Sequence, residues 1–130
     1  MQTLLAVGLG GAFGAIARYL LVSRIGHAVG PGGVAGIPVG VVTVNLLGSV
    51  VMGLVTEYLA LKWSPSAEMR AFLTVGALGG FTTFSTFALE AGVLLQRDAV
   101  AQAVIYIGGS VMLSILGLFA GLSIMRWLLT

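Results

Sequence analysis

The chain has 130 residues, which is enough for one domain at most, and 58% of them are hydrophobic while 8% are charged. A soluble domain carries about 25% charged residues, and so small a chain cannot bury this much apolar surface in its own core. A water-soluble monomer and a disordered chain are therefore excluded. The absence of cysteine excludes disulfides and thiolate chemistry, and six scattered basic residues are too few for a nucleic-acid surface.

Four segments are apolar enough to cross a membrane. Charged side chains are absent from residues 1–17, 28–56, 71–89 and 99–125. Because a membrane-spanning helix needs about 20 mostly apolar residues, the sequence predicts spans at roughly 3–22, 38–60, 70–95 and 101–125. The connection at residues 27–38 is rich in glycine and is expected to be irregular. Ser66, in the next connection, is placed to cap the third helix. The predicted fold is therefore an all-α membrane protein of one four-helix domain, residues 1–130.

Three pairs of glycines stand four residues apart within these spans. They are Gly10 with Gly14, Gly76 with Gly80, and Gly117 with Gly121. Small residues at this spacing let helices approach closely in lipid, where the hydrophobic effect does not drive helix pairing. The 20 glycines of the chain therefore predict close helix packing rather than flexibility.

The basic residues give no preference for either orientation in the membrane. Lys62, Arg70 and Arg126 fall on one side of the predicted spans, and Arg18, Arg24 and Arg97 fall on the other. Since basic residues near the span ends set topology, this balance predicts insertion in both orientations and an antiparallel dimer. Alternatively, a single charge or the α-amino group sets one orientation.

The third span carries a polar cluster near its centre, at about residue 83. Gly79 and Gly80 precede Phe81, Thr82 and Thr83, and glycine and β-branched residues are weak helix formers. We expect a break in the helix here, at mid-membrane. The exposed carbonyls of such a break could bind a small cation, and its free N–H groups would favour anions. The alternative is a continuous helix whose hydroxyls bond back to carbonyls one turn earlier.

Polar residues also lie within the second and fourth spans. The amide of Asn45 can donate two hydrogen bonds to an anion, or it can form a hydrogen bond between helices. Tyr106, Ser110 and Ser114 are four residues apart on the fourth span, so their hydroxyls share one face. This arrangement suggests a track for an ion, and a packing stripe is the alternative.

Four further side chains near these clusters are candidates for function. Phe84 and Phe87 share a face, where they either pack or offer their positive ring edges to an anion. Glu90 follows one turn later, and a carboxylate within a membrane is a functional candidate by default. Arg18 either extends outward to the interface or gathers anions at a pore entrance.

The sequence closely resembles the Fluc (CrcB) family of fluoride channels. The resemblance covers all four spans and rests on G-x-x-x-R-Y from Gly14 to Tyr19, V-N-L-L around Asn45, and G-G-F-T-T-F-S-T-F-x-x-E from Gly79 to Glu90. It implies passive, fluoride-selective conduction across the cell inner membrane and so resistance to fluoride toxicity. It also implies a dual-topology homodimer with two antiparallel pores, with fluoride, the lipid bilayer and a second copy as the partners, and with no enzymatic activity.

The resemblance also implies roles for individual residues. A structural sodium ion at the dimer interface would be held by the backbone carbonyls of Gly79 and Thr82. The side chains expected at the fluoride pore are Asn45, Phe84, Phe87, Ser85, Thr86, Glu90, Tyr106, Ser110 and Ser114. Phe81 departs from the family pattern, in which leucine is common, but it retains the apolar bulk.

Two other classes of protein remain as alternatives. A small multidrug transporter also has four spans, but its proton-coupled mechanism needs a carboxylate in the first span, and none is present here. In a non-conducting membrane scaffold, the glycines and phenylalanines would only pack. Measurements of flux would distinguish the three.

Overall fold

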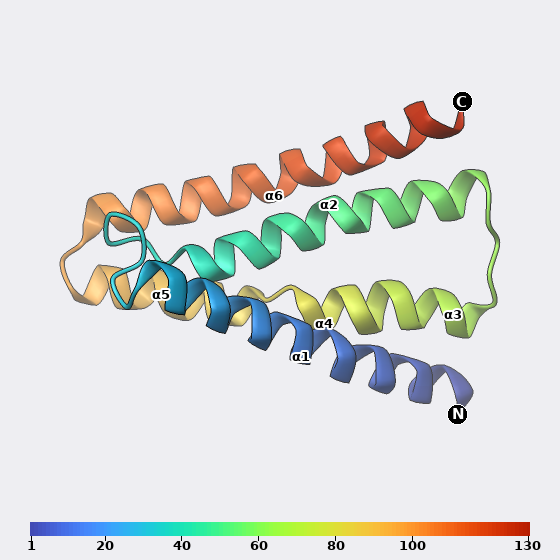
Figure 1. Ribbon diagram of the computed structural model, residues 1–130, viewed down its shortest axis with the longest axis horizontal. Helices are drawn as coiled ribbons and strands as arrows, with labels where there is room; N and C mark the ends of the chain where they lie inside the picture. Colours follow the sequence, from blue (N-terminus) through green and yellow to red (C-terminus); the bar gives the residue numbers. More distant parts are fainter.

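The computed structural model describes all 130 residues, and its polypeptide folds into four long helices, each antiparallel to the one before it (Figure 1). The third long helix is made of four consecutive elements, α3, η1, α4 and α5. The elements are α1 (Gln2–Val29), α2 (Val39–Leu61), α3 (Ala67–Ala71), η1 (Phe72–Leu78, a π-helix), α4 (Gly79–Phe81), α5 (Phe84–Gln96) and α6 (Val100–Leu129). Each long helix is apolar and long enough to cross a membrane, and both termini lie at the same end of the molecule (Figure 1).

The first helix is longer than the predicted span. α1 continues beyond residue 22 to Val29 and so includes the start of the segment that was expected to be irregular. Hydropathy marks where the apolar stretch ends, but backbone hydrogen bonding decides where the helix ends. Gly30 terminates α1 with a φ of 80°, a backbone conformation that suits glycine. At the third helix, the predicted Ser66 cap is confirmed, because its hydroxyl accepts a 3.3 Å hydrogen bond from the Met69 N–H.

Glycines allow α1 to lie against the first half of the third helix. A Cβ atom added to Gly10 would lie 2.9 Å from the backbone nitrogen of Ala77, and one added to Gly14 would collide with the carbonyl oxygen of Ala77. Gly76 and Gly80 meet the backbone of α1 from the other side. The prediction of close packing at both of these glycine pairs is confirmed.

Glycines also allow α2 and α6 to pack closely against each other. A Cβ atom on Gly121 would collide with the carbonyl oxygen of Val50, and one on Gly53 would collide with that of Leu118. Gly117 lies against the Leu46 side chain, where a Cβ atom would approach to 2.8 Å. The third predicted glycine pair therefore also lies in a close helix contact.

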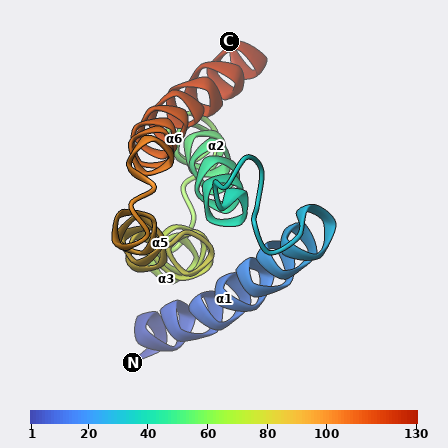
Figure 2. The ribbon, with the colours of Figure 1, turned by 90° about the vertical axis from the view of Figure 1, so that its left-hand side faces the viewer.

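The helices form an open arc rather than a closed bundle. In the end view, α6 and α2 lie side by side, the third helix follows, and α1 crosses beneath it (Figure 2). Only 18 of the 130 residues are buried, and large apolar side chains such as Phe13 and Phe119 face outward. Such a surface requires lipid or another protein chain to cover it.

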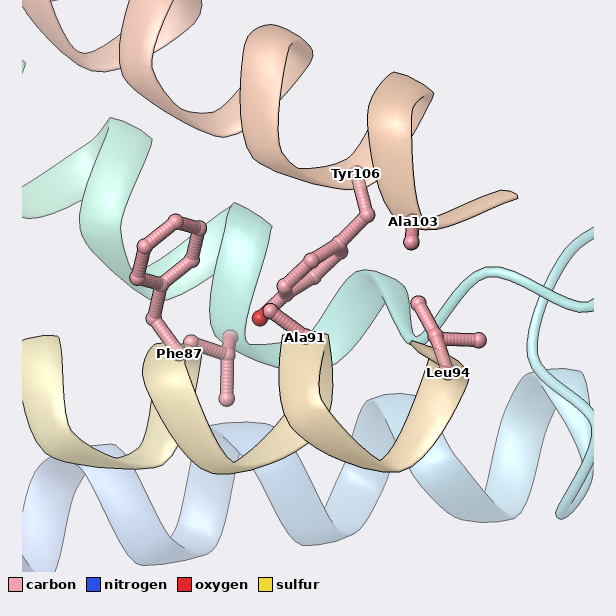
Figure 3. Packing of buried hydrophobic residues seen from close by; sticks show 6 residues of the cluster. Phe87, Ala91, Leu94, Ala103 and Tyr106 are labelled. Carbon is pink, nitrogen blue, oxygen red and sulfur yellow. The ribbon is translucent and has the colours of Figure 1, made fainter. Parts of the chain in front are cut away.

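One buried cluster joins α5 to α6 at the end of the molecule away from the termini. Figure 3 shows the Tyr106 ring reaching from α6 toward Phe87 and Ala91 of α5, with Leu94 and Ala103 beyond it. Tyr106 and Ala103 are almost fully buried. This cluster fixes the position of α5 and hence of the segment that precedes it.

Candidate functional site

The regular helix of the third segment is interrupted at two threonines. α4 ends at Phe81 and α5 begins at Phe84, and between them Thr82 (φ −83°, ψ 160°) and Thr83 (φ −152°, ψ 123°) have extended backbones. Gly79 itself keeps helical angles. The interruption therefore falls on the β-branched pair rather than on the glycines, in agreement with the low helix propensity of threonine.

The side-chain amide of Asn45, on α2, forms hydrogen bonds with both backbone polar groups of Thr83. Its Nδ2 donates to the Thr83 carbonyl oxygen over 2.9 Å, and its Oδ1 accepts from the Thr83 N–H over 2.8 Å. Of the two roles that the sequence left open for Asn45, the hydrogen bond between helices is thus present. One N–H of the amide is still available for another acceptor, because an amide NH₂ group carries two donors.

Thr83 caps the N-terminus of α5. Its Oγ1 accepts a 3.3 Å hydrogen bond from the Thr86 N–H and lies 3.1 Å from the Thr86 Oγ1 and 3.4 Å from the Ser85 Oγ. The structure therefore places Ser85 and Thr86 around the cap. The sequence-based prediction omitted Thr83, although a threonine that precedes a helical run is a typical N-cap signal.

Because of these hydrogen bonds, two backbone N–H groups do not donate to the carbonyls that they would reach in a continuous helix. The Thr83 N–H would bond to the Gly79 carbonyl and the Thr86 N–H to the Thr82 carbonyl, because a helical N–H bonds four residues back. Instead they donate to Asn45 and to the Thr83 hydroxyl. The two carbonyls implied as sodium ligands are thus among those that lose their helical donors, and carbonyl oxygen is a suitable ligand for a hard cation.

Arg18 of α1 reaches the same place. Its Nη1 donates a 3.1 Å hydrogen bond to the Thr82 carbonyl oxygen. Arg18 was expected at a pore entrance or extended to the interface, and in the single protomer its guanidinium is bound at the interruption.

A groove of about 430 Å³ opens beside the interruption. Its walls come from α2, from the segment around the two threonines, and from α6. The polar or aromatic residues that line it are Asn45, Ser49, Thr82, Thr83, Phe84, Phe87, Ser110 and Ser114. Ser49, which shares a helix face with Asn45, was not among the predicted site residues. No ionisable side chain lines the groove.

Ser110 holds a hydroxyl without a partner in this groove. Its side chain is 5% exposed, and its Oγ has no hydrogen-bond partner. A buried, unsatisfied hydroxyl costs about 1–3 kcal/mol. Ser110 and Ser114 face the groove together, so the polar face predicted on the fourth span does border a cavity.

Glu90 and Tyr106 form a pair outside the groove lining. The Tyr106 hydroxyl donates to Glu90 Oε2 over 2.6 Å, which uses its only hydrogen. Tyr106 therefore stands apart from the two serines with which it was grouped. It is linked to the groove by aromatic stacking, because its ring lies 5.3 Å from that of Phe87, which lies 5.3 Å from that of Phe84.

Comparisons with known proteins identify the family of this chain. The model of the family described as CrcB-like protein, Camphor Resistance (CrcB), matches residues 5–122. Three similar proteins, each named fluoride-specific ion channel FluC, come from Rhodospirillum centenum (46% identity over 97% of both chains), Chelativorans sp. (47% over 99% of this chain and 100% of the relative) and Phenylobacterium zucineum (47% over 97% of both). With four helices able to span a bilayer and a family match over most of its length, the chain is a multi-pass membrane protein that belongs to the CrcB family.

Proposed function

We propose that this protein is a channel that conducts fluoride passively and selectively out of the cell across the inner membrane. The observation that carries the proposal is the groove, whose polar groups are all uncharged and include the unpartnered Ser110 hydroxyl. The name of the relatives, which are 42–47% identical over nearly the whole chain, supports fluoride as the ion. Conduction requires no covalent step, so the protein is not proposed to be an enzyme.

The chemistry of the groove suits a small anion that holds its water tightly. To enter, fluoride must exchange water for other donors, and hydroxyls and an amide supply these without a fixed positive charge that would retain the ion. The free N–H of Asn45 and the hydroxyls of Ser110 and Ser114 are suitable donors. The edges of the Phe84 and Phe87 rings are positive and can line the remaining wall.

Residues near the groove would act indirectly. Ser85 and Thr86 surround the cap of α5, and Glu90 holds the Tyr106 ring against Phe87. We propose that they set the width and polarity of the pathway where it continues past the groove.

The pore is proposed to form only in an antiparallel dimer. The groove is open to one side, and Phe84 at its edge is 78% exposed. A second copy in the opposite orientation would cover this face, and two-fold symmetry would produce two equivalent pores.

The distribution of positive charge supports insertion in both orientations. Arg126 is 2.6 Å from the buried Glu57 carboxylate, and Arg18 is bound at the interruption. When these two are set aside, Lys62 and Arg70 remain at one end of the molecule and two arginines, Arg24 and Arg97, at the other. The balance thus stays even, as dual topology requires.

A structural sodium ion at the dimer interface is proposed to bind the carbonyls of Gly79 and Thr82. Both have lost their helical donors, and each subunit would present the same pair across the two-fold axis. When bound, the ion would supply positive charge midway between the two pores. The contribution of the chain itself is the rigid presentation of these oxygens by Asn45 and Thr83.

Efflux from proteoliposomes tests the proposal. Vesicles loaded with potassium fluoride should release fluoride when valinomycin allows potassium to follow, at a rate that a proton gradient does not change. Cation uptake driven by a proton gradient would instead indicate a multidrug-type exporter. Fluoride release no faster than from protein-free vesicles would indicate a non-conducting scaffold. Either result would refute the proposal of a channel.

A further inference from the structure

Arg18 is brought to the interruption by the glycine contact that precedes it on α1. Gly14, one turn earlier, packs so closely on α4 that an added Cβ atom would lie 2.8 Å from the Phe81 nitrogen. This approach lets the Arg18 guanidinium reach the Thr82 carbonyl, 64 residues away in the sequence, over 3.1 Å.

Arg18 has no carboxylate partner, and its guanidinium donates to a backbone carbonyl instead. The only ion pair in the protein joins Arg126 to Glu57, and Glu90 is bound by Tyr106. The positive charge of Arg18 is instead met by the C-terminal end of the helical stretch Ala67–Phe81. Unsatisfied carbonyls give a helix C-terminus partial negative charge, which favours a cation.

The carbonyl that Arg18 occupies is one of the two oxygens proposed to hold sodium. We propose that Arg18 is a resident cation that competes with sodium for the Thr82 carbonyl, so that sodium binding and dimer assembly displace its guanidinium. This inference rests on the sodium site and the dimer of the proposed function.

The competition follows from charge rather than from a lack of lone pairs. A carbonyl oxygen has two lone pairs and can accept two partners, but two cations on one oxygen repel each other strongly in a site with little water. In the single protomer, Arg18 stabilises the Thr82 carbonyl, which has no helical donor. In the dimer, sodium bound by both subunits would replace that bond, so Arg18 raises the sodium concentration needed for assembly.

The dimer fraction as a function of sodium concentration tests this directly. The chain has no cysteine, so Thr130→Cys provides a single labelling site on the full-length protein. The labelled protein is diluted in detergent across a range of sodium chloride, with N-methyl-glucamine chloride keeping the ionic strength constant, and dimers are counted by photobleaching steps. Arg18→Gln should lower the sodium midpoint about tenfold, a size usual for coupled sites.

Two variants serve as matched controls. Arg24→Gln removes the same charge from an exposed position on the same helix, and Arg18→Lys keeps the charge at the interruption. Both should keep the wild-type midpoint. An unchanged or higher midpoint in Arg18→Gln, or an equal fall in Arg24→Gln or Arg18→Lys, would overturn the competition.

The same titration separates this inference from the proposed function. If wild-type dimers form equally well without sodium, the sodium site itself fails and the competition fails with it. If wild type depends on sodium but Arg18→Gln behaves identically, only the role of Arg18 fails. Because dimers are counted without fluoride, neither result depends on conduction.

Discussion

Asn45 and Thr83 hold each other through two hydrogen bonds, one to each polar group of the Thr83 backbone. Backbone groups buried within a membrane must find partners, and this side chain supplies them where the helix cannot. The same exchange takes the Thr83 N–H away from Gly79. One amide therefore both stabilises the interruption and leaves a carbonyl free for a cation.

Loss of the Asn45 amide should weaken the fold as well as the channel. Asn45→Ala leaves a buried N–H and a buried C=O without partners, at a cost of about 1–3 kcal/mol each. We expect a lower unfolding temperature in detergent and a rate of fluoride efflux close to that of protein-free vesicles. Thr43→Ala is the control, because its hydroxyl only bonds back to Val39 on the same helix. Wild-type stability in Asn45→Ala would show that the clamp is dispensable.

The two phenylalanines should respond differently to the same substitution. Phe87 is 8% exposed and stacks on Tyr106, whereas Phe84 is 78% exposed. Phe87→Ile should lower the unfolding free energy by about 2 kcal/mol and reduce fluoride flux. Phe84→Ile should reduce flux strongly while the protomer keeps its stability and dimers still form. Normal fluoride flux in both variants would assign the rings to packing alone.

Within the helices, substitution of a glycine should be costly only where two helices touch. Gly14→Ala places a methyl group against the Ala77 carbonyl, and overpacking of this kind costs about 1–3 kcal/mol. Gly8→Ala, on the same helix, meets no atom within 4 Å and should leave stability equal or slightly higher. Thermal unfolding of the two variants in the same detergent checks this, and equal losses would argue against the glycine contact.

Added charge should fix the orientation of the chain. Ala28→Lys with Gly32→Lys loads one end of the molecule at exposed positions, and basic residues favour the cytoplasmic side. This variant alone should form few active dimers and protect cells poorly against fluoride. Co-expression with Ser64→Lys, Thr130→Lys, which loads the other end, should restore protection. Full protection by either variant alone would argue against dual insertion.

The sequence predicted much of this structure because hydropathy and glycine spacing act locally. Four apolar stretches gave the four helices, and the glycine pairs marked both close helix contacts. The hydrogen bonds of individual polar groups depend on partners that are distant in the sequence, and the periodicity of the sequence does not reveal these partners. Arg18 bound to Thr82 and Tyr106 bound to Glu90 are contacts of this kind. The sequence left two roles open for Asn45, and only the fold shows that its amide forms a hydrogen bond between helices.

The uncharged donors beside the interrupted helix are proposed to conduct fluoride and to reject other halides. The most direct measurement is the efflux of fluoride and of chloride from proteoliposomes of the purified protein, each loaded at equal concentration and opened with valinomycin. We expect rapid release of fluoride and release of chloride no faster than from protein-free vesicles. Equal release of both ions, or release of neither, would contradict the proposal.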